Sequence, residues 1–111
     1  MEHSYEVKIT RQAMDQMKEI SFYISKSLLV PEIANQLLDK IKGAIISLSS
    51  FPKKHALVEE EPWRSAGVRR LVVNNFLIYF WIDEEKFKVQ VTAVIYNKRN
   101  QIQQLTNMDL S

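Results

Sequence analysis

The run from Phe76 to Ile82 constrains the fold of this chain more than any other segment, because every position in it is apolar. It is far shorter than the roughly 20 residues that a helix needs to cross a bilayer. In a chain that folds in water, a short apolar run of this kind is typical of a central β-strand covered on both faces. The rest of the chain must therefore supply neighbouring strands and elements that cover the sheet.

Two further strand patterns flank this run, and short turn sequences join them to it. Val68–Val73 comes before it and ends at Asn74-Asn75, a pair that suits a tight hairpin turn with positive φ. Asp83–Lys86 forms a second turn, and Phe87–Tyr96 then alternates in polarity. The three segments predict an antiparallel meander.

The alternation in the last strand also predicts which side chains share a face of the sheet. Tyr96 should lie on the face away from the covering elements, together with Lys88 and Thr92. On the first strand of the meander, Arg69 and Arg70 point to opposite faces, and the sequence leaves open which of them is on the open face. The set expected to face the covering helices is Phe87, Val89, Val91, Ala93 and Ile95.

Two amphipathic helices are predicted before the meander. Apolar residues recur at spacings of three and four from Arg11 to about Leu28, and again from Pro31 to Leu48. With almost no linker between them, the helices must form an antiparallel hairpin. Phe51-Pro52 ends the second helix, because a residue before proline avoids the α region. Residues 5–9 alternate in polarity and predict a short N-terminal strand.

These elements predict an α+β fold. An N-terminal strand is followed by an antiparallel helical hairpin and a three-stranded antiparallel meander, with the helices packed on one face of a twisted sheet. We expect residues 1–111 to form a single domain, with 100–111 as a flexible polar tail that can order on a partner. The N-terminus has no apolar signal segment, so we expect a cytoplasmic protein that does not associate with membranes.

Composition excludes several classes of site. The chain has no Cys, which excludes disulfides, thiol chemistry and thiolate metal sites. Two histidines are too few for a multi-histidine metal site, and two glycines are too few for a glycine-rich phosphate loop. We therefore expect neither a metal nor a cofactor.

Basic residues outnumber acidic ones in the stretch Trp63–Leu105, which has seven Lys and Arg against three Asp and Glu. The formal net charge is only +2, from 15 Lys and Arg against 13 Asp and Glu. A candidate polyanion site combines residues of two strands and the segment that follows them, because Arg and Lys bind phosphate and Tyr can stack on a base. Its members are Arg69, Arg70, Tyr96, Lys98 and Arg99. The alternative is that these charges are solvated and pair with nearby acidic residues.

The residues also resemble a known family. The segment 67–83, GVRRLVVNNFLIYFWID, and the closing group 94–100, VIYNKRN, are similar to the C-terminal half of RelE/ParE-type toxins, the toxic components of bacterial type II toxin–antitoxin pairs. The helical hairpin that ends in Phe-Pro matches the upstream part of the family. The resemblance extends from about Tyr5 to Asn100.

The resemblance implies a ribosome-dependent mRNA endoribonuclease in which a ribose 2′-OH attacks the adjacent phosphate. That reaction needs a proton acceptor, a proton donor and cations at the phosphate. Arg69 and Arg99 would stabilise charge, so they should be needed for toxicity and not for folding. Lys98 and Tyr96 would handle protons or position the RNA. The residues that would contact the RNA are Arg70, Lys88 and His55.

Two departures from the family pattern favour an alternative function. Many cleaving members carry an Arg within the stretch that is Phe76-Leu77-Ile78 here, and some keep a His in the closing group, where this chain has Asn97 and Asn100. A ParE-like toxin that inhibits DNA gyrase without cutting RNA is therefore the alternative, and a degenerate, non-toxic relative is a third possibility.

The resemblance also implies partners. A cognate antitoxin should form a hetero-oligomer with this chain by wrapping a segment over the basic, partly apolar sheet face that the helices leave open. The target would be ribosome-bound mRNA or, in the alternative, DNA gyrase.

Overall fold

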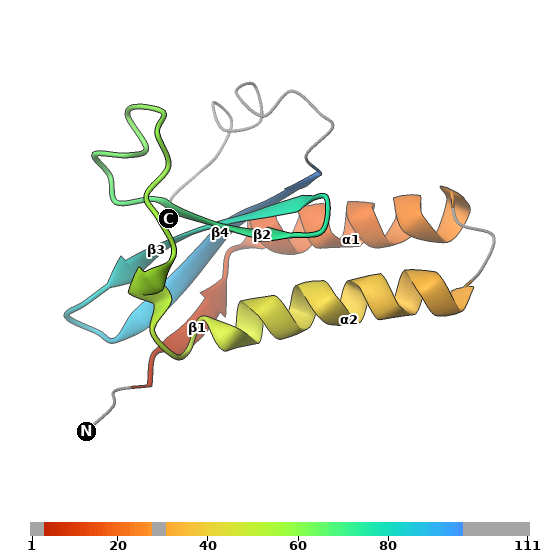
Figure 1. The fold of residues 1–111 in the computed structure, drawn as a ribbon, viewed down its shortest axis with the longest axis horizontal. Coiled ribbons are helices and arrows are strands. Elements are labelled where there is room, and N and C mark those ends of the chain that lie inside the picture. Colours follow the sequence, from red (N-terminus) through yellow and green to blue (C-terminus); the bar gives the residue numbers. More distant parts are fainter. Residues whose placement is uncertain (1–3, 28–30, 97–111) are drawn as a thin grey trace.

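Two helices lie side by side on one face of a four-stranded sheet in the computed structural model, which describes residues 4–27 and 31–96 (Figure 1). This is the α+β fold expected from the sequence. In chain order the elements are β1 Glu6–Ile9, α1 Arg11–Ser27, α2 Pro31–Ser47, the 3-10 segment η1 Pro52–Lys54, β2 Arg69–Val73, β3 Phe76–Asp83 and β4 Lys88–Tyr96. The predicted tail at 100–111 lies outside the described residues.

The sheet has the strand order β1-β4-β3-β2. Strands β2, β3 and β4 form the predicted antiparallel meander. β1 adds to the far side of β4 in parallel, with Val7 opposite Val89 and Ile9 opposite Val91. The apolar run that became β3 is thus an inner strand, and its residues Phe76 to Phe80 are all buried.

The helical hairpin packs its apolar stripes on one face of the sheet. Ala13 and Ile20 of α1 and Ile41 and Ile45 of α2 are buried there, as the helical spacing predicted. The sheet residues in this core, which we call the helix-side core, are Phe76, Ile78, Phe80, Val89, Val91 and Val94. No helix among the described residues is long and apolar enough to cross a membrane.

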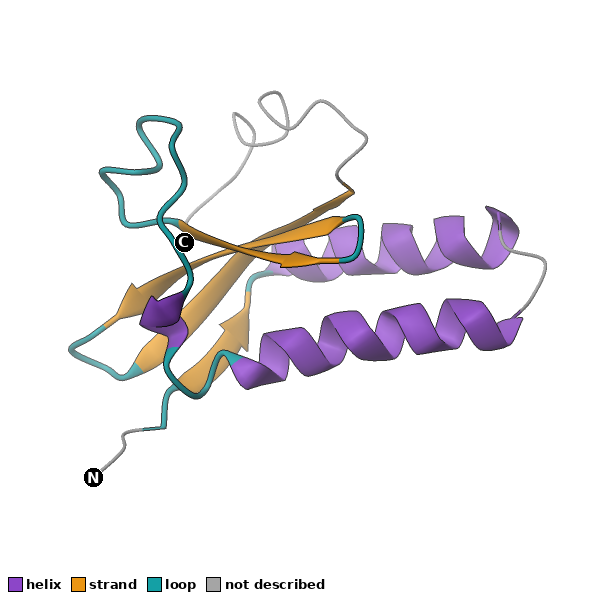
Figure 2. Ribbon diagram, viewed as in Figure 1, coloured by secondary structure: helices purple, strands orange, loops and turns teal. Residues whose placement is uncertain are grey.

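The opposite face of the sheet has a second, smaller core. The segment between η1 and β2 passes over this face (Figure 2), and it contributes Val58 and Trp63. Gly67 returns the chain to β2 at a φ of +85°, which a glycine adopts without strain. The sheet residues buried on this side are Leu77, Tyr79, Ala93 and Ile95. The face that we expected to be left open for a partner is therefore partly filled by the chain itself.

Both turns of the meander contain a residue with a positive φ, which an asparagine readily adopts and a phenylalanine rarely does. Asn74 has a φ of 51°, the positive value expected for one residue of the Asn-Asn pair. Phe87 also has a positive φ, of 50°, and precedes β4 instead of starting it. Its ring is 42% exposed and packs against Tyr5, with 5.8 Å between the ring centroids.

A β-bulge interrupts the pairing of β3 with β4. Tyr79 lies opposite Ala93, but its neighbour Phe80 lies opposite Val91, so Thr92 is an extra residue in β4. Thr92 is fully buried, and its hydroxyl donates to the carbonyl of Tyr79 at 3.4 Å. An extra residue shifts the two-residue alternation of side chains by one position.

The bulge makes the predicted face of Tyr96 wrong. Val91 faces the helices as expected, but beyond Thr92 the helix-side core contains Val94 and has Tyr96 packed against it. Ala93 and Ile95, which we expected to face the helices, belong to the core on the opposite face.

β1 pairs only with residues Lys88–Val91 of β4. The residues at the start of α1 cover the next part of the same edge. β1 ends opposite Val91, and α1 begins two residues later. The side-chain carbonyl of Gln16 accepts a hydrogen bond from the backbone N–H of Val94 at 2.9 Å, and the Thr10 hydroxyl donates to the carbonyl of Thr92 at 3.4 Å. These side chains take the place of a neighbouring strand.

Candidate functional site

Of the predicted catalytic residues the structure describes Arg69 and Tyr96, and it places these two at different positions along β3. Arg69 lies opposite Phe80 in the β2–β3 pairing, whereas Tyr96 lies opposite Phe76 in the β3–β4 pairing. Four residues of an extended strand separate these two positions, which is about 13 Å at 3.3 Å per residue. Lys98 and Arg99 lie outside the described residues.

Arg69 connects β2 to the segment that follows α2. It shares the helix side of the sheet with Leu71, and its Nη1 donates hydrogen bonds to the backbone carbonyls of His55, at 2.7 Å, and Lys53, at 3.3 Å. These two carbonyls lie fourteen and sixteen residues before Arg69 in the chain. The Arg69 guanidinium therefore holds the segment around η1 against the sheet.

Arg70 is the arginine that points to the face away from the helices. It lies opposite Tyr79, which is buried in the core on that face. Burial raises the pKa of the Tyr79 hydroxyl, and the Arg70 guanidinium beside it acts in the opposite direction. The two adjacent arginines therefore lie on opposite faces of the sheet.

Lys88 lies at the end of β4 that is remote from Tyr96. It is paired with Asp83 of β3 and Glu6 of β1, and its Nζ is 3.9 Å from the Glu6 carboxylate. The length of β4 separates Lys88 from Tyr96, so this predicted RNA contact and the predicted catalytic tyrosine belong to different ends of the sheet.

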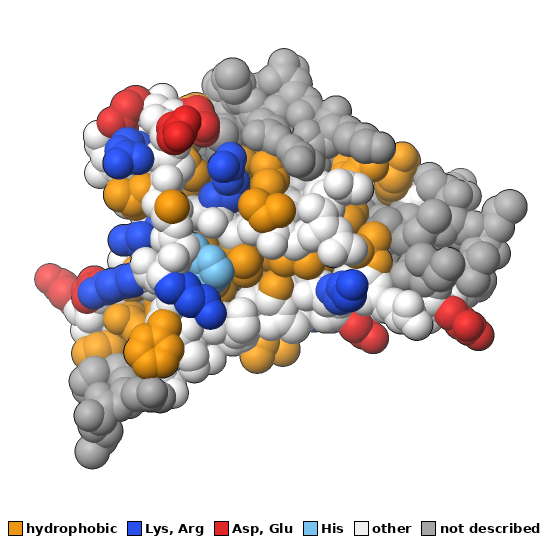
Figure 3. Space-filling model, viewed as in Figure 1, with side chains coloured by type: hydrophobic (Ala, Val, Ile, Leu, Met, Phe, Trp, Pro, Cys, Tyr) orange, Lys and Arg blue, Asp and Glu red, His pale blue; other side chains and the backbone are white. Residues whose placement is uncertain are grey.

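His55 lies in a group of cations that the fold does assemble. Lys53, Lys54, His55 and Arg69 form a basic cluster at η1, and in Figure 3 blue side chains surround the pale-blue histidine there. The His55 ring packs edge-on against Phe80 at 5.9 Å. Burial lowers the pKa of His55, and the charges of Lys54 and Arg69 lower it further.

The two lysines of this cluster were missed by the sequence analysis. They directly follow Phe51-Pro52 and precede His55, and this Lys-Lys-His run was the available signal. Lys53 also forms an ion pair with Glu84 at 2.6 Å, and hydrogen bonding to that carboxylate raises the pKa of Lys53. The cluster can attract an anion, but its arginine and one lysine already have partners.

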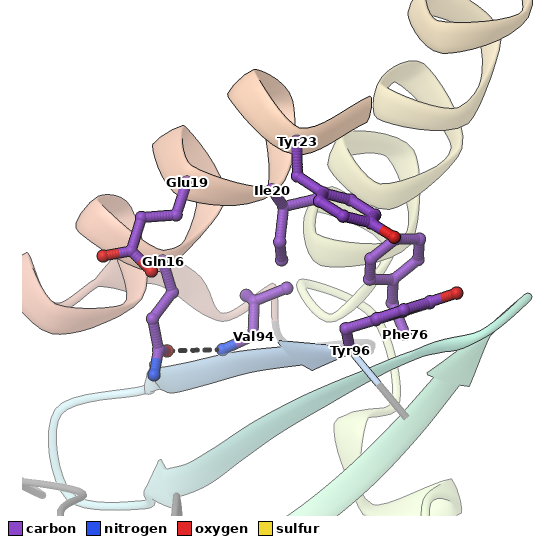
Figure 4. A pocket seen from close by; sticks show the side chains of 7 residues that line it. All are labelled: Gln16, Glu19, Ile20, Tyr23, Phe76, Val94 and Tyr96. Carbon is purple, nitrogen blue, oxygen red and sulfur yellow. Dashed lines mark hydrogen bonds between the residues drawn. The ribbon is translucent and has the colours of Figure 1, made fainter. Parts of the chain in front are cut away.

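Tyr96 lies in a different environment, a pocket between α1 and the end of the sheet (Figure 4). Its ring packs against Phe76 with 5.2 Å between centroids, and against Tyr23 of α1 with 5.9 Å. We call this the aromatic pocket. Its lining residues are Gln16, Glu19, Ile20, Tyr23, Phe76, Val94 and Tyr96.

The described residues provide only part of what RNA cleavage requires. They bring a histidine and several cations together at η1, whereas the tyrosine proposed for proton transfer lies at the other end of β3. Within the same residues, no group of three or more His, Asp or Glu side chains is placed to hold a metal ion. The arrangement therefore provides two separate binding surfaces, one basic and one aromatic.

Comparison with known proteins decides the family. Residues 7–101 match the sequence profile of the ParE toxin of the type II toxin–antitoxin system parDE. The chain belongs to the ParE toxin family. It is thus a type II toxin of the RelE/ParE superfamily, as the sequence motifs indicated. No curated protein sequence matches this toxin at a significant level.

Solved structures share the toxin's fold at low sequence identity. The chromosomal ParDE system of P. aeruginosa matches with a TM-score of 0.67 and 23% identity, over 85% of this chain and 97% of that one. The RelBE2 complex of Mycobacterium tuberculosis gives 0.59 and 19%, over 85% and 92%. The isolated E. coli RelE toxin gives 0.53 and 14%, over 93% and 95%.

The role of Arg69 in holding η1 can be tested by substitution. We expect Arg69→Ala to lower the free energy of unfolding by about 1.5 kcal/mol, since it removes charged hydrogen bonds to two carbonyls. Urea unfolding measures this. Lys54→Ala is the matched control, because it removes a charge from the same cluster, and it should change stability by less than about 0.5 kcal/mol. Equal effects of the two substitutions would contradict the structural role.

The lowered pKa of His55 predicts a dependence of stability on pH. The unfolded chain binds the proton more readily, near the usual pKa of about 6.5, so protonation favours unfolding. We expect the urea midpoint to fall as the pH is lowered through about 6.5 toward the lower pKa that His55 has in the folded state. His55→Asn should reduce that dependence, while His3 remains in both proteins as an internal control. An unchanged pH profile in the variant would rule out His55 as its source.

Proposed function

We propose that this toxin acts by binding a protein target, DNA gyrase, and does not cut RNA. The observation that carries the proposal is the separation of Arg69 from Tyr96 along β3, with each side chain already engaged in packing or hydrogen bonds. The match to the ParE family also supports this proposal.

Cleavage of ribosome-bound mRNA is the competing function, and the chemistry explains why it is less well supported. A 2′-OH attack needs proton-transfer groups within hydrogen-bond reach of one phosphate, which is about 3 Å, and cations at the same phosphate. The backbones of Arg69 and Tyr96 are offset by about 13 Å along β3. The Arg69 side chain extends to the carbonyls of Lys53 and His55. The Tyr96 ring extends instead to the rings of Phe76 and Tyr23, so the two side chains do not meet at one phosphate in this arrangement. A toxin that binds its target needs no such convergence.

The assay that separates the two functions follows DNA and protein synthesis after controlled expression in a host without the antitoxin. We expect DNA synthesis to stop and DNA breaks to appear while translation continues. We also expect Tyr96→Phe to be as toxic as wild type, because it keeps the ring and removes only the hydroxyl that proton transfer would use. Tyr23→Phe is the matched control.

The same assay can overturn the proposal. Early arrest of translation, relieved by Tyr96→Phe and not by Tyr23→Phe, would establish RNA cleavage instead. Normal growth in the presence of folded, expressed protein would reject both toxic functions and would show that the chain is a non-toxic relative of the family.

We further propose that a cognate antitoxin forms a hetero-oligomer with this toxin and binds the helical hairpin. A groove of about 390 Å³ lies between the two helices and the end of β1. Ile46 is 68% exposed and Met14 is 50% exposed, and both line this groove, so exposed apolar surface is gathered at one place, as at protein interaction sites. The groove residues are Ile9, Met14, Met17, Lys18, Lys42, Ile45 and Ile46.

Gly43 is an exposed residue of α2 that follows the groove residue Lys42. It lies in the interior of α2, one turn before Ile46, where glycine destabilises a helix by about 1 kcal/mol relative to alanine. A Cβ placed on Gly43 would meet nothing within 4 Å, so packing within the chain does not require glycine there. The bare backbone instead allows another chain to approach α2 closely. The lysines at the groove, Lys18 and Lys42, favour acidic residues on that chain and disfavour a second copy of the toxin.

Two substitutions at one position test the antitoxin surface. We expect Gly43→Ala to stabilise the free toxin by up to about 1 kcal/mol. Gly43→Trp should leave the toxin folded and weaken binding of the antitoxin encoded beside it at least tenfold, because the indole occupies the space for the partner. Calorimetric titration measures the affinity. Gln36→Trp, two turns earlier on α2 and also exposed, should bind within about threefold of wild type. Equal affinities for the two tryptophan variants would place the antitoxin elsewhere.

A further inference from the structure

We infer that the aromatic pocket binds the guanidinium group of an arginine from a protein partner. The pocket combines aromatic rings with one carboxylate, and Figure 4 shows Tyr23 reaching down from α1 toward Tyr96 and Phe76 of the sheet. This inference goes beyond the proposed function, because it holds whether the partner is the target or another protein.

The walls of the pocket are fixed by interactions within the chain. Gln16 bonds the backbone N–H of Val94 at 2.9 Å, which sets the distance between α1 and β4 on one side. On the other side, the ring of Tyr96 packs against both Phe76 and Tyr23. The site is therefore formed before any partner arrives, and a ligand would not have to order it.

The chemistry of the lining favours a cation. The negative faces of aromatic rings attract a cation within about 6 Å of the ring centroid. Glu19 supplies a carboxylate at the end of the pocket where Gln16 lies, opposite the aromatic rings (Figure 4), and no described residue forms an ion pair with it. None of the lining residues is Lys or Arg, so the lining contains no positive charge to compete with a ligand.

The size of the pocket selects among cations and excludes a nucleobase. Its volume is about 40 Å³. A water needs about 10–15 Å³ measured in this way, so the space holds about three waters. That suits a single guanidinium or ammonium group and is too small for a stacked base. Arginine fits better than lysine, because a planar guanidinium can lie on a ring and donate to a carboxylate at the same time.

The surroundings of the pocket indicate a protein as the source of the arginine. Tyr23, which lines the pocket, is 47% exposed. Phe22, the preceding residue of α1, is 63% exposed. Exposed aromatic residues are enriched at protein interfaces, in which an arginine from the partner often serves as an anchor. A free polyamine would cover less of this exposed aromatic surface than a folded partner would.

The experiment titrates the full-length toxin with small peptides at constant ionic strength and follows the tyrosine ring resonances by NMR. The probes are a blocked Gly-Arg-Gly peptide, the same peptide with neutral citrulline in place of arginine, and spermidine. We expect the arginine peptide to give saturable shifts of Tyr23 and Tyr96, the citrulline peptide to give none, and spermidine to bind at least fivefold more weakly. The amide signal of Val94 reports that the pocket is intact.

Paired variants identify the residues responsible. Glu19→Gln and Tyr23→Leu should each weaken binding of the arginine peptide at least fivefold. Their controls are Asp15→Asn, an exposed acid of the same helix, and Phe22→Leu, an exposed aromatic residue beside the pocket, which should bind within twofold of wild type.

Three results would overturn the inference. One is the absence of saturable shifts with the arginine peptide, and another is equal binding of the citrulline peptide. The third is tighter binding of spermidine that depends on Glu19, which would assign the pocket to a free amine.

Discussion

The pairing of β3 with β4 is the interaction on which the rest of the structure depends. These two inner strands bury apolar side chains on both faces, so the helix-side core and the smaller core opposite share one backbone ladder. The apolar run at Phe76–Phe80 requires cover on both sides, and the helical hairpin and the segment after η1 provide it. A change in this pairing would move side chains in both cores at once.

Most of the fold could be predicted from local patterns in the sequence. The helices follow from apolar spacing, and the meander follows from three strand patterns separated by turn residues. The parallel pairing of β1 with β4 could not be predicted, because four residues of alternating polarity carry no information about their partner. The bulge was also hidden, since a strict alternation through Thr92 looks regular in the sequence although the backbone inserts one residue there.

The candidate site was less predictable than the fold, for a geometric reason. The sequence identified residues of suitable chemistry, but the distance between them depends on strand register. Arg69 lies opposite Phe80 and therefore beside η1. Tyr96 lies opposite Phe76 and therefore beside α1. The bulge then turns Tyr96 toward the helices, where it joins Tyr23. Arg69 and Tyr96, which were predicted to act at one site, thus belong to a basic cluster and to an aromatic pocket.

The contact of α1 with β4 has a consequence for how the toxin exists before it meets a partner. Exposed strand edges can pair with other chains and so promote aggregation. Gln16 and Thr10 bond the backbone of Val94 and Thr92, so an incoming strand meets side chains along this stretch and finds those two backbone groups occupied. The same helix that forms the wall of the aromatic pocket thus protects a strand edge of the sheet, and it directs association toward side-chain recognition and away from strand addition at this edge.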